Sequence, residues 1–187
     1  TTPTSSATTI QPRSAPTSLR AYKTNVVKTP TRPAVHFGPR VVCIGCGIGG
    51  EVLGARRAGM DVVCCIDLCP ANCRILHRRY PDVRVIEGDI NLFEQWRHHV
   101  PLDIDLVTVA MQCQPSSSLN VDRSPDDPRH DTNYNMLMSA IKLNTHCIII
   151  ENVFGFADNC PEQCSRTLDT LRAMGYYPKL YRINSKC

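Results

Sequence analysis

Two residues able to take part in covalent chemistry follow apolar runs of strand length. Cys113 lies just beyond the apolar run 104–110, in a polar stretch, and Glu151 comes directly after the run 147–150. A thiol in such a loop can act as a nucleophile, although Cys113 alone could be an incidental thiol. A carboxylate at the mouth of a buried strand is costly unless it is paired or used. A nucleophile and an acid on neighbouring strand ends together predict a catalytic site.

A glycine cluster predicts a ligand-binding turn. Residues 45–50 read Gly-Cys-Gly-Ile-Gly-Gly and follow the short apolar run 40–44. Glycines there allow a tight turn and the close approach of a ligand at the start of the next helix. Asp67 and Asp89 end the next two apolar runs, where a carboxylate can bind ribose hydroxyls or an adenine amino group. The cluster would serve NAD, FAD or S-adenosylmethionine, or form only a structural turn, and each acid could be a helix cap.

Alternating strands and helices position these residues. The predicted strands cover residues 40–44, 61–66, 83–86, 104–110, 147–150 and 177–183. The predicted helices follow the glycine cluster as far as Ala58 and then cover residues 70–79, 92–99, 132–142 and 161–174, with a polar loop over 112–129. Strict alternation with continuous apolar strands predicts an α/β fold, a doubly wound, mostly parallel sheet with helices on both faces. Ligands of such sheets bind at the carboxyl ends of the strands.

Composition divides the chain into an arm and one globular domain. The 187 residues are 42% hydrophobic, which suffices for a single core. Residues 1–38 are rich in Thr, Ser and Pro, and residues 1–50 carry six basic side chains and no acid. We expect residues 1–38 to be disordered unless a partner orders them. This arm could bind a polyanion, act as a solvated tail or, since it resembles a transit peptide, direct the chain to an organelle.

The cysteines indicate free thiols rather than a disulfide framework. Eleven cysteines are irregularly spaced, and Cys64, Cys65 and Cys147 lie in apolar runs that predict buried strands. Without a signal peptide, this pattern predicts an intracellular, reducing compartment. The pairs 43/46 and 160/164 could ligate zinc, but no second pair with a His partner stands at finger spacing, so we expect no metal. No apolar run approaches the roughly 20 residues of a membrane span, so we expect no membrane partner.

Taken together and in order, six short motifs resemble the cytosine-5 DNA methyltransferase family. They are Cys-Gly-Ile-Gly-Gly (46–50), Ile-Asp (66–67), Gly-Asp-Ile (88–90), Cys-Gln-Pro-x-Ser (113–117), Asp-Pro-Arg (127–129) and Glu-Asn-Val (151–153). The closing Leu-x-x-Met-Gly-Tyr of residues 171–176 fits as well. The resemblance covers about residues 41–187. It implies that residues 39–187 form the N-terminal, catalytic half of a Rossmann-like, S-adenosylmethionine-dependent methyltransferase without its target-recognition region.

The resemblance also implies a role for each motif. Cys113 would attack C6 of a cytosine flipped out of DNA, and Glu151 would contact the N3 edge while C5 takes a methyl group from S-adenosylmethionine. The implied cofactor-binding residues are Gly45, Gly47, Ile48, Gly49, Gly50, Cys65, Ile66, Asp67, Asp89 and Ile90. The implied substrate-binding residues are Gln114, Ser117, Asn152 and Arg129.

Several positions depart from the family pattern and keep an alternative open. Gln112 precedes Cys113 where the family usually has proline, Ser116 replaces a Phe, and Cys65 replaces the Glu that takes the ribose hydroxyls. The family's later arginine motif and target-recognition region have no counterpart. The alternative is a catalytically inactive structural subunit of a larger assembly, in which its basic arm anchors it and other protein chains supply the missing half or order the arm. tRNA is an alternative substrate to DNA, and an organelle is an alternative location to the nucleus or its equivalent.

Overall fold

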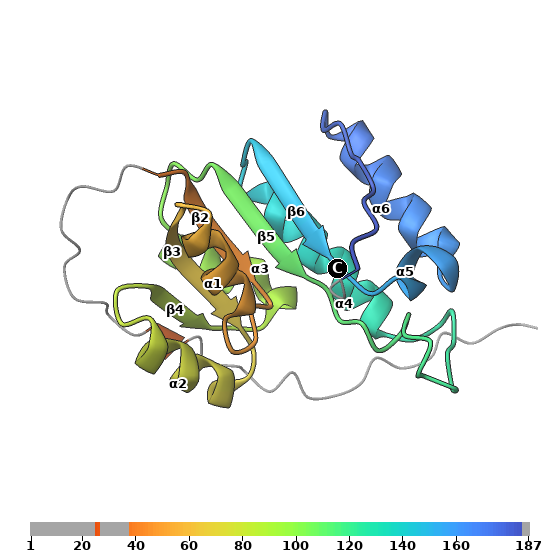
Figure 1. The fold of residues 1–187 in the computed structure, drawn as a ribbon, viewed down its shortest axis with the longest axis horizontal. Coiled ribbons are helices and arrows are strands. Elements are labelled where there is room, and N and C mark those ends of the chain that lie inside the picture. Colours follow the sequence, from red (N-terminus) through yellow and green to blue (C-terminus); the bar gives the residue numbers. More distant parts are fainter. Residues whose placement is uncertain (1–24, 27–37, 185–187) are drawn as a thin grey trace, which may run out of the picture.

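A six-stranded sheet with helices on both faces makes up the described part of the protein, residues 25–26 and 38–184 of a computed structural model (Figure 1). The strands lie in the order β1-β4-β3-β2-β5-β6. Their bounds are β1 Asn25–Val26, β2 Arg40–Ile44, β3 Asp61–Asp67, β4 Arg84–Glu87, β5 Leu106–Ala110 and β6 Cys147–Glu151. Strands β2 to β6 are parallel, and β1 pairs antiparallel with β4. The predicted doubly wound, mostly parallel α/β sheet is confirmed.

The helices form a layer on each face of this sheet. Their bounds are α1 Gly50–Arg57, α2 Pro70–Arg79, α3 Phe93–Trp96, α4 Arg129–Lys142, α5 Gly155–Asp158 and α6 Pro161–Ala173, with 3-10 turns η1 Ile90–Leu92 and η2 Arg97–His99 beside α3. Two clusters of buried side chains result, one between the sheet and α1 and α2, the other between the sheet and α3, α4 and α6. Pro70 and Pro161 start their helices because a proline's fixed φ suits the first turn. None of the helices described is long and apolar enough to cross a membrane.

The strand order places a switch point between β2 and β5. From β2 the chain continues outward through β3 to β4, whereas β5 and β6 extend the sheet in the opposite direction. The register aligns the ends of these strands, since Ile44 pairs with Val109 and Ala110 pairs with Glu151. The loops that follow β2 and β5 therefore leave the same edge of the sheet, where doubly wound folds bind their ligands.

The last predicted strand, residues 177–183, is wrong. This segment has no regular structure, and the side chains of Tyr177 and Ile183 are 95% and 80% exposed. An alternation of apolar residues becomes a strand only where its backbone finds a neighbouring strand, and this segment pairs with none in the described part of the chain. Arg182 forms an ion pair with Asp158, which ties the segment to α5 instead.

The prediction that residues 147–150 form a buried strand is half wrong. The strand β6 exists, but Cys147 is exposed and Ile149 is 50% exposed, while Ile148 and Ile150 pack against the core. β6 is the last strand of the sheet, and the cluster beneath α1 and α2 includes residues of β2 to β5 but none of β6. A short apolar run does not distinguish a central strand from an edge strand with one open face.

Two elements were not predicted. Strand β1 lies within the basic arm, where Asn25 and Val26 pair with Glu87 and Ile86 of β4. The prediction of disorder for the other residues of the arm falls on 1–24 and 27–37, outside the described residues, and on residue 38, which is a bend.

The second element that was not predicted is the short helix α5, which follows directly after β6. In addition, α4 starts at Arg129 rather than near residue 132.

Candidate active site

Residues 45–50, here called the Gly loop, contain three glycines in the backbone conformation for which glycine is needed. Gly45, Gly47 and Gly49 have φ values of 70°, 52° and 92°. A Cβ on Gly45 would lie 2.8 Å from the carbonyl oxygen of Ala110, so the Gly loop packs directly against the end of β5. A Cβ on Gly47 or Gly50 would meet nothing within 4 Å. The Gly loop therefore has a packed inner side and an open outer side.

Asp67 holds the Gly loop in place. Its Oδ2 accepts a hydrogen bond from the backbone N–H of Gly47 at 2.8 Å. Its Oδ1 accepts from the backbone N–H of Cys69 at 2.9 Å and from the side-chain amide of Asn72 at 3.1 Å. The carboxylate is 9% exposed and all three bonds are internal, so the structure gives Asp67 an anchoring role at the start of α2.

Cys65 and Ile66, two implied cofactor residues, lie in the core with 0% and 1% exposure. Cys65 is in register with Cys43 on the adjacent strand, and Cys46 of the Gly loop is also buried. Hydrogen bonds to these two thiols, and then burial, raise the pKa of the Cys65 thiol well above its usual value. At the position where the resemblance places the family's ribose carboxylate, the structure has a buried thiol packed beside two others.

The remaining implied cofactor residues lie closer to the surface. The Ile48 side chain is 55% exposed at the tip of the Gly loop. Asp89 and Ile90, after β4, are half-buried. Asp89 Oδ1 accepts hydrogen bonds from the backbone N–H and the side-chain amide of Asn91, both at 2.9 Å, and so caps η1. Its Oδ1 is thus engaged locally, as for a helix cap.

The structure brings Cys113 and Glu151 to neighbouring strand ends. Residues 111–128, here called the Cys113 loop, connect β5 to α4. The backbone N–H of Met111 donates to the carbonyl oxygen of Glu151 at 3.2 Å, which joins the two segments two residues before Cys113. Cys113 and Glu151 are both exposed. A thiol and a carboxylate thus lie at one sheet edge beside the Gly loop, an arrangement that can serve nucleophilic catalysis.

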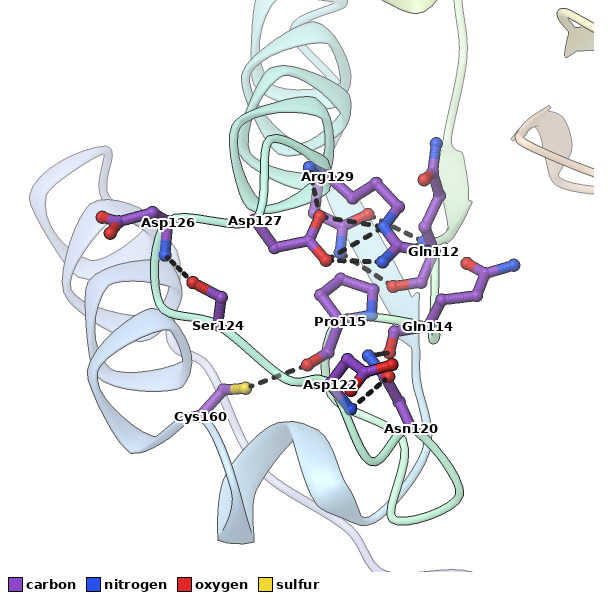
Figure 2. Close-up of polar contacts among 11 residues, drawn as sticks. Gln112, Gln114, Pro115, Asn120, Asp122, Ser124, Asp126, Asp127, Arg129 and Cys160 are labelled. Carbon is purple, nitrogen blue, oxygen red and sulfur yellow. Dashed lines mark hydrogen bonds and ion pairs between the residues drawn. The ribbon is translucent and has the colours of Figure 1, made fainter.

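A tight turn follows Cys113. Its carbonyl oxygen accepts hydrogen bonds from the backbone N–H groups of Ser116 and Ser117 at 3.0 and 2.8 Å. Pro115 and Ser116 are buried, whereas Gln114 is exposed and its carbonyl oxygen accepts from Asn120 (Figure 2). The side chains of Cys113 and Gln114 are therefore presented outward from a fixed turn.

The two other implied substrate residues are placed differently. Arg129 forms a bidentate pair with Asp127, with Nε–Oδ1 and Nη2–Oδ2 distances of 2.8 and 2.5 Å (Figure 2). The hydrogen bonds from Arg129 lower the pKa of Asp127 to about 2. Asn152 follows Glu151, and its Nδ2 is buried without a hydrogen-bond partner among the described residues. Arg129 therefore orders the start of α4, and Asn152 has a donor to spare.

No metal site accompanies these groups in the part of the chain described. No three His, Cys, Asp or Glu side chains there are arranged to hold an ion. The ten cysteines within residues 38–184 are all free thiols.

Comparison with known proteins identifies the family. The model of the C-5 cytosine-specific DNA methylase family matches residues 40–186. The chain belongs to this family. The Type II methyltransferase M.NgoMIV of Neisseria gonorrhoeae is 35% identical over 124 residues, which are 66% of this chain and 38% of that protein. M.AquIA of Picosynechococcus is 30% identical over 122 residues, 62% of this chain and 49% of that protein. The chain thus spans less than half the length of either relative.

Solved structures agree with the fold. An Escherichia coli prophage protein described as a DNA modification methyltransferase superposes with a TM-score of 0.61 at 20% identity, over 73% of this chain and 38% of its own. At this identity the likeness shows the fold alone.

Sequence reasoning missed three residues of this candidate site. Glu51, in the first turn of α1, is near enough to Glu151 that their charges interact, and burial together with this charge raises the pKa of Glu51 to about 7. Asn133 on α4 binds the backbone of Gln112, and Asn159 after α5 binds the carbonyl of Ser116. The one available signal was that Glu51 directly follows the glycine cluster.

Proposed function

We propose that this chain supplies the cofactor-binding and nucleophile-bearing part of a DNA (cytosine-5) methyltransferase. The observation that carries the proposal is the hydrogen bond between Met111 and Glu151, because it places Cys113 and Glu151 together beside the Gly loop. The family match over residues 40–186 supports it. The free thiols of the described residues suit a reducing compartment.

The Gly loop fits S-adenosylmethionine on its open side. Gly47 and Gly50 leave space that any side chain would fill, and Ile48 is exposed beside them. Gly45, Gly49, Cys65, Ile66, Asp67, Asp89 and Ile90 complete the proposed set of cofactor-binding residues. Cys65 has no carboxylate and the carboxylate of Asp67 is fully engaged, so the ribose would depend on Asp89, whose Oδ2 accepts no hydrogen bond from the described residues.

The side chains of the site support a covalent mechanism. Cys113 Sγ would attack C6 of a flipped cytosine, and Glu151 would contact the N3 edge and stabilise the charge as C5 becomes nucleophilic. S-adenosylmethionine, when bound, supplies the methyl group that C5 takes. Loss of the C5 proton then expels Cys113 and restores its thiolate. Gln114, Ser117, Asn152 and Arg129 are the proposed contacts to the nucleotide, and the buried, unpartnered Nδ2 of Asn152 is a donor available for it.

A structural role without catalysis is the second candidate function. The observation that favours it is Cys65, a buried neutral thiol at the position of the family's ribose carboxylate. Such a subunit would keep the fold and lack cofactor affinity.

Calorimetry with S-adenosylmethionine tests the first step, with Gly47→Asp as the control. We expect micromolar binding by the full chain and none by the variant, because Asp tolerates the positive φ of Gly47 and would fill the open side of the Gly loop. The absence of binding at millimolar cofactor would favour the structural subunit.

Covalent capture tests the nucleophile. In DNA that contains 5-fluorocytosine, fluorine replaces the proton of C5 and cannot leave after methyl transfer from added S-adenosylmethionine. Cys113 should therefore remain attached to C6 and shift the protein in a denaturing gel. Cys113→Ser should not shift, although its folding should be unchanged because Cys113 is exposed. An equal shift with Cys113→Ser would refute the assignment of the nucleophile.

A further inference from the structure

Asn133 forms hydrogen bonds with the backbone of the residue immediately before Cys113. The N–H of Gln112 donates to Asn133 Oδ1 at 2.7 Å, and Asn133 Nδ2 donates to the carbonyl oxygen of Gln112 at 2.9 Å. Asn133 belongs to α4 and is 3% exposed. Figure 2 shows Gln112 beside the first turn of this helix. One buried amide side chain therefore engages both polar groups of a single residue's backbone.

Two reciprocal bonds restrain more than one bond would. A single hydrogen bond leaves a peptide free to pivot about it, whereas a donor and an acceptor on the same residue fix both φ and ψ. A buried amide without hydrogen-bond partners would destabilise the fold, and these two bonds satisfy the Asn133 side chain in the core. An apolar side chain of similar size would fill the space without orienting Gln112.

The restraint matters because packing does not fix the Cys113 side chain, which is exposed. Its direction follows from the backbone on either side, that is, from Gln112 before it and from the turn closed by Ser116 and Ser117 after it. A proline at position 112 would set the local backbone by its ring but would offer Asn133 no N–H. Gln112 lacks the ring and supplies that N–H, so Asn133 provides the restraint from outside the loop.

We infer that Asn133 is a positioning residue that aims Cys113 at its target by clamping the backbone of Gln112. The inference rests on the proposed function, since it assumes that Cys113 is the nucleophile. Asn133 itself touches neither substrate nor cofactor in this assignment.

The test compares two reactions of Cys113 in the full chain. Capture by 5-fluorocytosine DNA with S-adenosylmethionine requires correct aim, whereas alkylation by iodoacetamide requires only exposure. In Asn133→Leu, which removes both bonds, capture should slow by about 30-fold or more, because a displacement near 1 Å costs on the order of 100-fold. Alkylation of Cys113, followed by peptide mass spectrometry with exposed Cys69 and Cys147 as references, should change by less than about threefold.

Asn135→Leu is the matched control. Asn135 is exposed on the same helix and donates to Asn91 at 2.8 Å, so the variant breaks a hydrogen bond of α4 away from the Cys113 loop. At saturating S-adenosylmethionine, which offsets any change at Asp89 through its partner Asn91, the capture rate of this variant should stay close to that of the unmodified chain. Asn133→Asp, which is isosteric and keeps the acceptor for the Gln112 N–H, should recover part of the rate. Capture by Asn133→Leu within twofold of the unmodified chain, or an equal loss in Asn135→Leu, would overturn the inference.

Amide hydrogen exchange separates this inference from the proposed function. If the unmodified chain captures no DNA, the proposed function fails, and the clamp is judged by the exchange of the Gln112 N–H. This exchange should be about tenfold or more faster in Asn133→Leu and unchanged in Asn135→Leu. An unchanged rate in Asn133→Leu would show that Asn133 does not restrain the backbone before Cys113.

Discussion

The Gly loop and the Cys113 loop leave the same edge of the sheet but are held in different ways. The Gly loop depends on glycine backbone conformation and on residues of the next β-α unit. Asp67 accepts its Gly47 N–H, and Arg79 and Tyr80 donate to its carbonyl oxygens. The Cys113 loop is held instead by two amide side chains, Asn133 on α4 and Asn159 directly after α5.

This difference separates the residues expected to affect cofactor affinity from those expected to orient Cys113. The anchors of the Gly loop lie at the end of β3 and at the end of α2, so a change there should lower stability and cofactor affinity together. The anchors of the Cys113 loop lie on α4 and directly after α5 and bind the loop's backbone. A change there should disturb the direction of Cys113 in addition to any loss of stability.

Gly155→Ala should have the largest effect, because the added Cβ would collide with the backbone of the Cys113 loop. A Cβ on Gly155 would overlap the carbonyl oxygen of Ser116 and lie 2.6 Å from Asn159 Nδ2. The Cys113 loop or α5 must shift, and we expect the free energy of unfolding to fall by about 2–3 kcal/mol. Urea unfolding measures this cost, and covalent capture by 5-fluorocytosine DNA should slow at the same time.

Gly54→Ala is the matched control. Gly54 lies inside α1, where a Cβ would meet nothing within 4 Å. Alanine there should stabilise the protein by about 0.5–1 kcal/mol, because it restricts the unfolded chain and favours the helix. If Gly155→Ala, like this control, did not lower the free energy of unfolding, α5 would not be in tight contact with the Cys113 loop.

The same contrast explains what the sequence could predict. The Gly loop was predictable because glycines, apolar runs and the proline at position 70 are local signals. The shared edge of Cys113 and Glu151 followed from the rule for parallel strands. The contact of Asn133 with Gln112 depends on which side of α4 faces the loop, which no periodicity encodes for a polar residue.

Two predictions failed for a related reason. The alternation over residues 177–183 gave no information on whether a neighbouring strand exists, and the apolar run 147–150 gave none on whether both faces of the strand are covered. Both outcomes depend on how other segments of the chain pack. The same is true of the close approach of Gly155 to the Ser116 carbonyl, which leaves no room for a Cβ. Local pattern therefore predicted the elements and the Gly loop better than the packing that surrounds Cys113.

Asp67→Ala should have the next largest effect, this time on the Gly loop. It removes the acceptor of three internal hydrogen bonds, so we expect a loss of about 2 kcal/mol in the free energy of unfolding. Affinity for S-adenosylmethionine should fall with it, whereas alkylation of Cys113 should not change. Asp89→Ala, which loses only the local cap around Asn91, should cost about 1 kcal/mol. Equal costs for the two variants would mean that Asp67 is no more than a cap.

Glu51→Gln should have the smallest effect and probes the electrostatic contact between the two loops. Glu51 lies at the base of the Gly loop, Glu151 lies beside the Cys113 loop, and Glu51 Oε2 is buried without a hydrogen-bond partner among the described residues. Burial and the charge of Glu151 raise the pKa of Glu51 to about 7. Because this pKa is higher in the folded protein than in the unfolded chain, the folded state binds the extra proton, and stability falls as pH rises from about 4.5 to 7.

Glutamine has no such proton, so Glu51→Gln should gain stability relative to the unmodified chain as pH rises. We expect its free energy of unfolding, taken as the difference from the unmodified chain, to increase by about 1–2 kcal/mol between pH 5 and pH 8. Urea unfolding at both pH values measures this difference, in which other titrating groups largely cancel. In a Glu151→Gln background the increase should shrink, because one of the two causes of the raised pKa is gone. If the difference in free energy of unfolding were independent of pH, Glu51 would already be ionised at pH 5 and the two loops would be electrostatically separate. If the increase survived Glu151→Gln in full, the raised pKa of Glu51 would be due to burial alone.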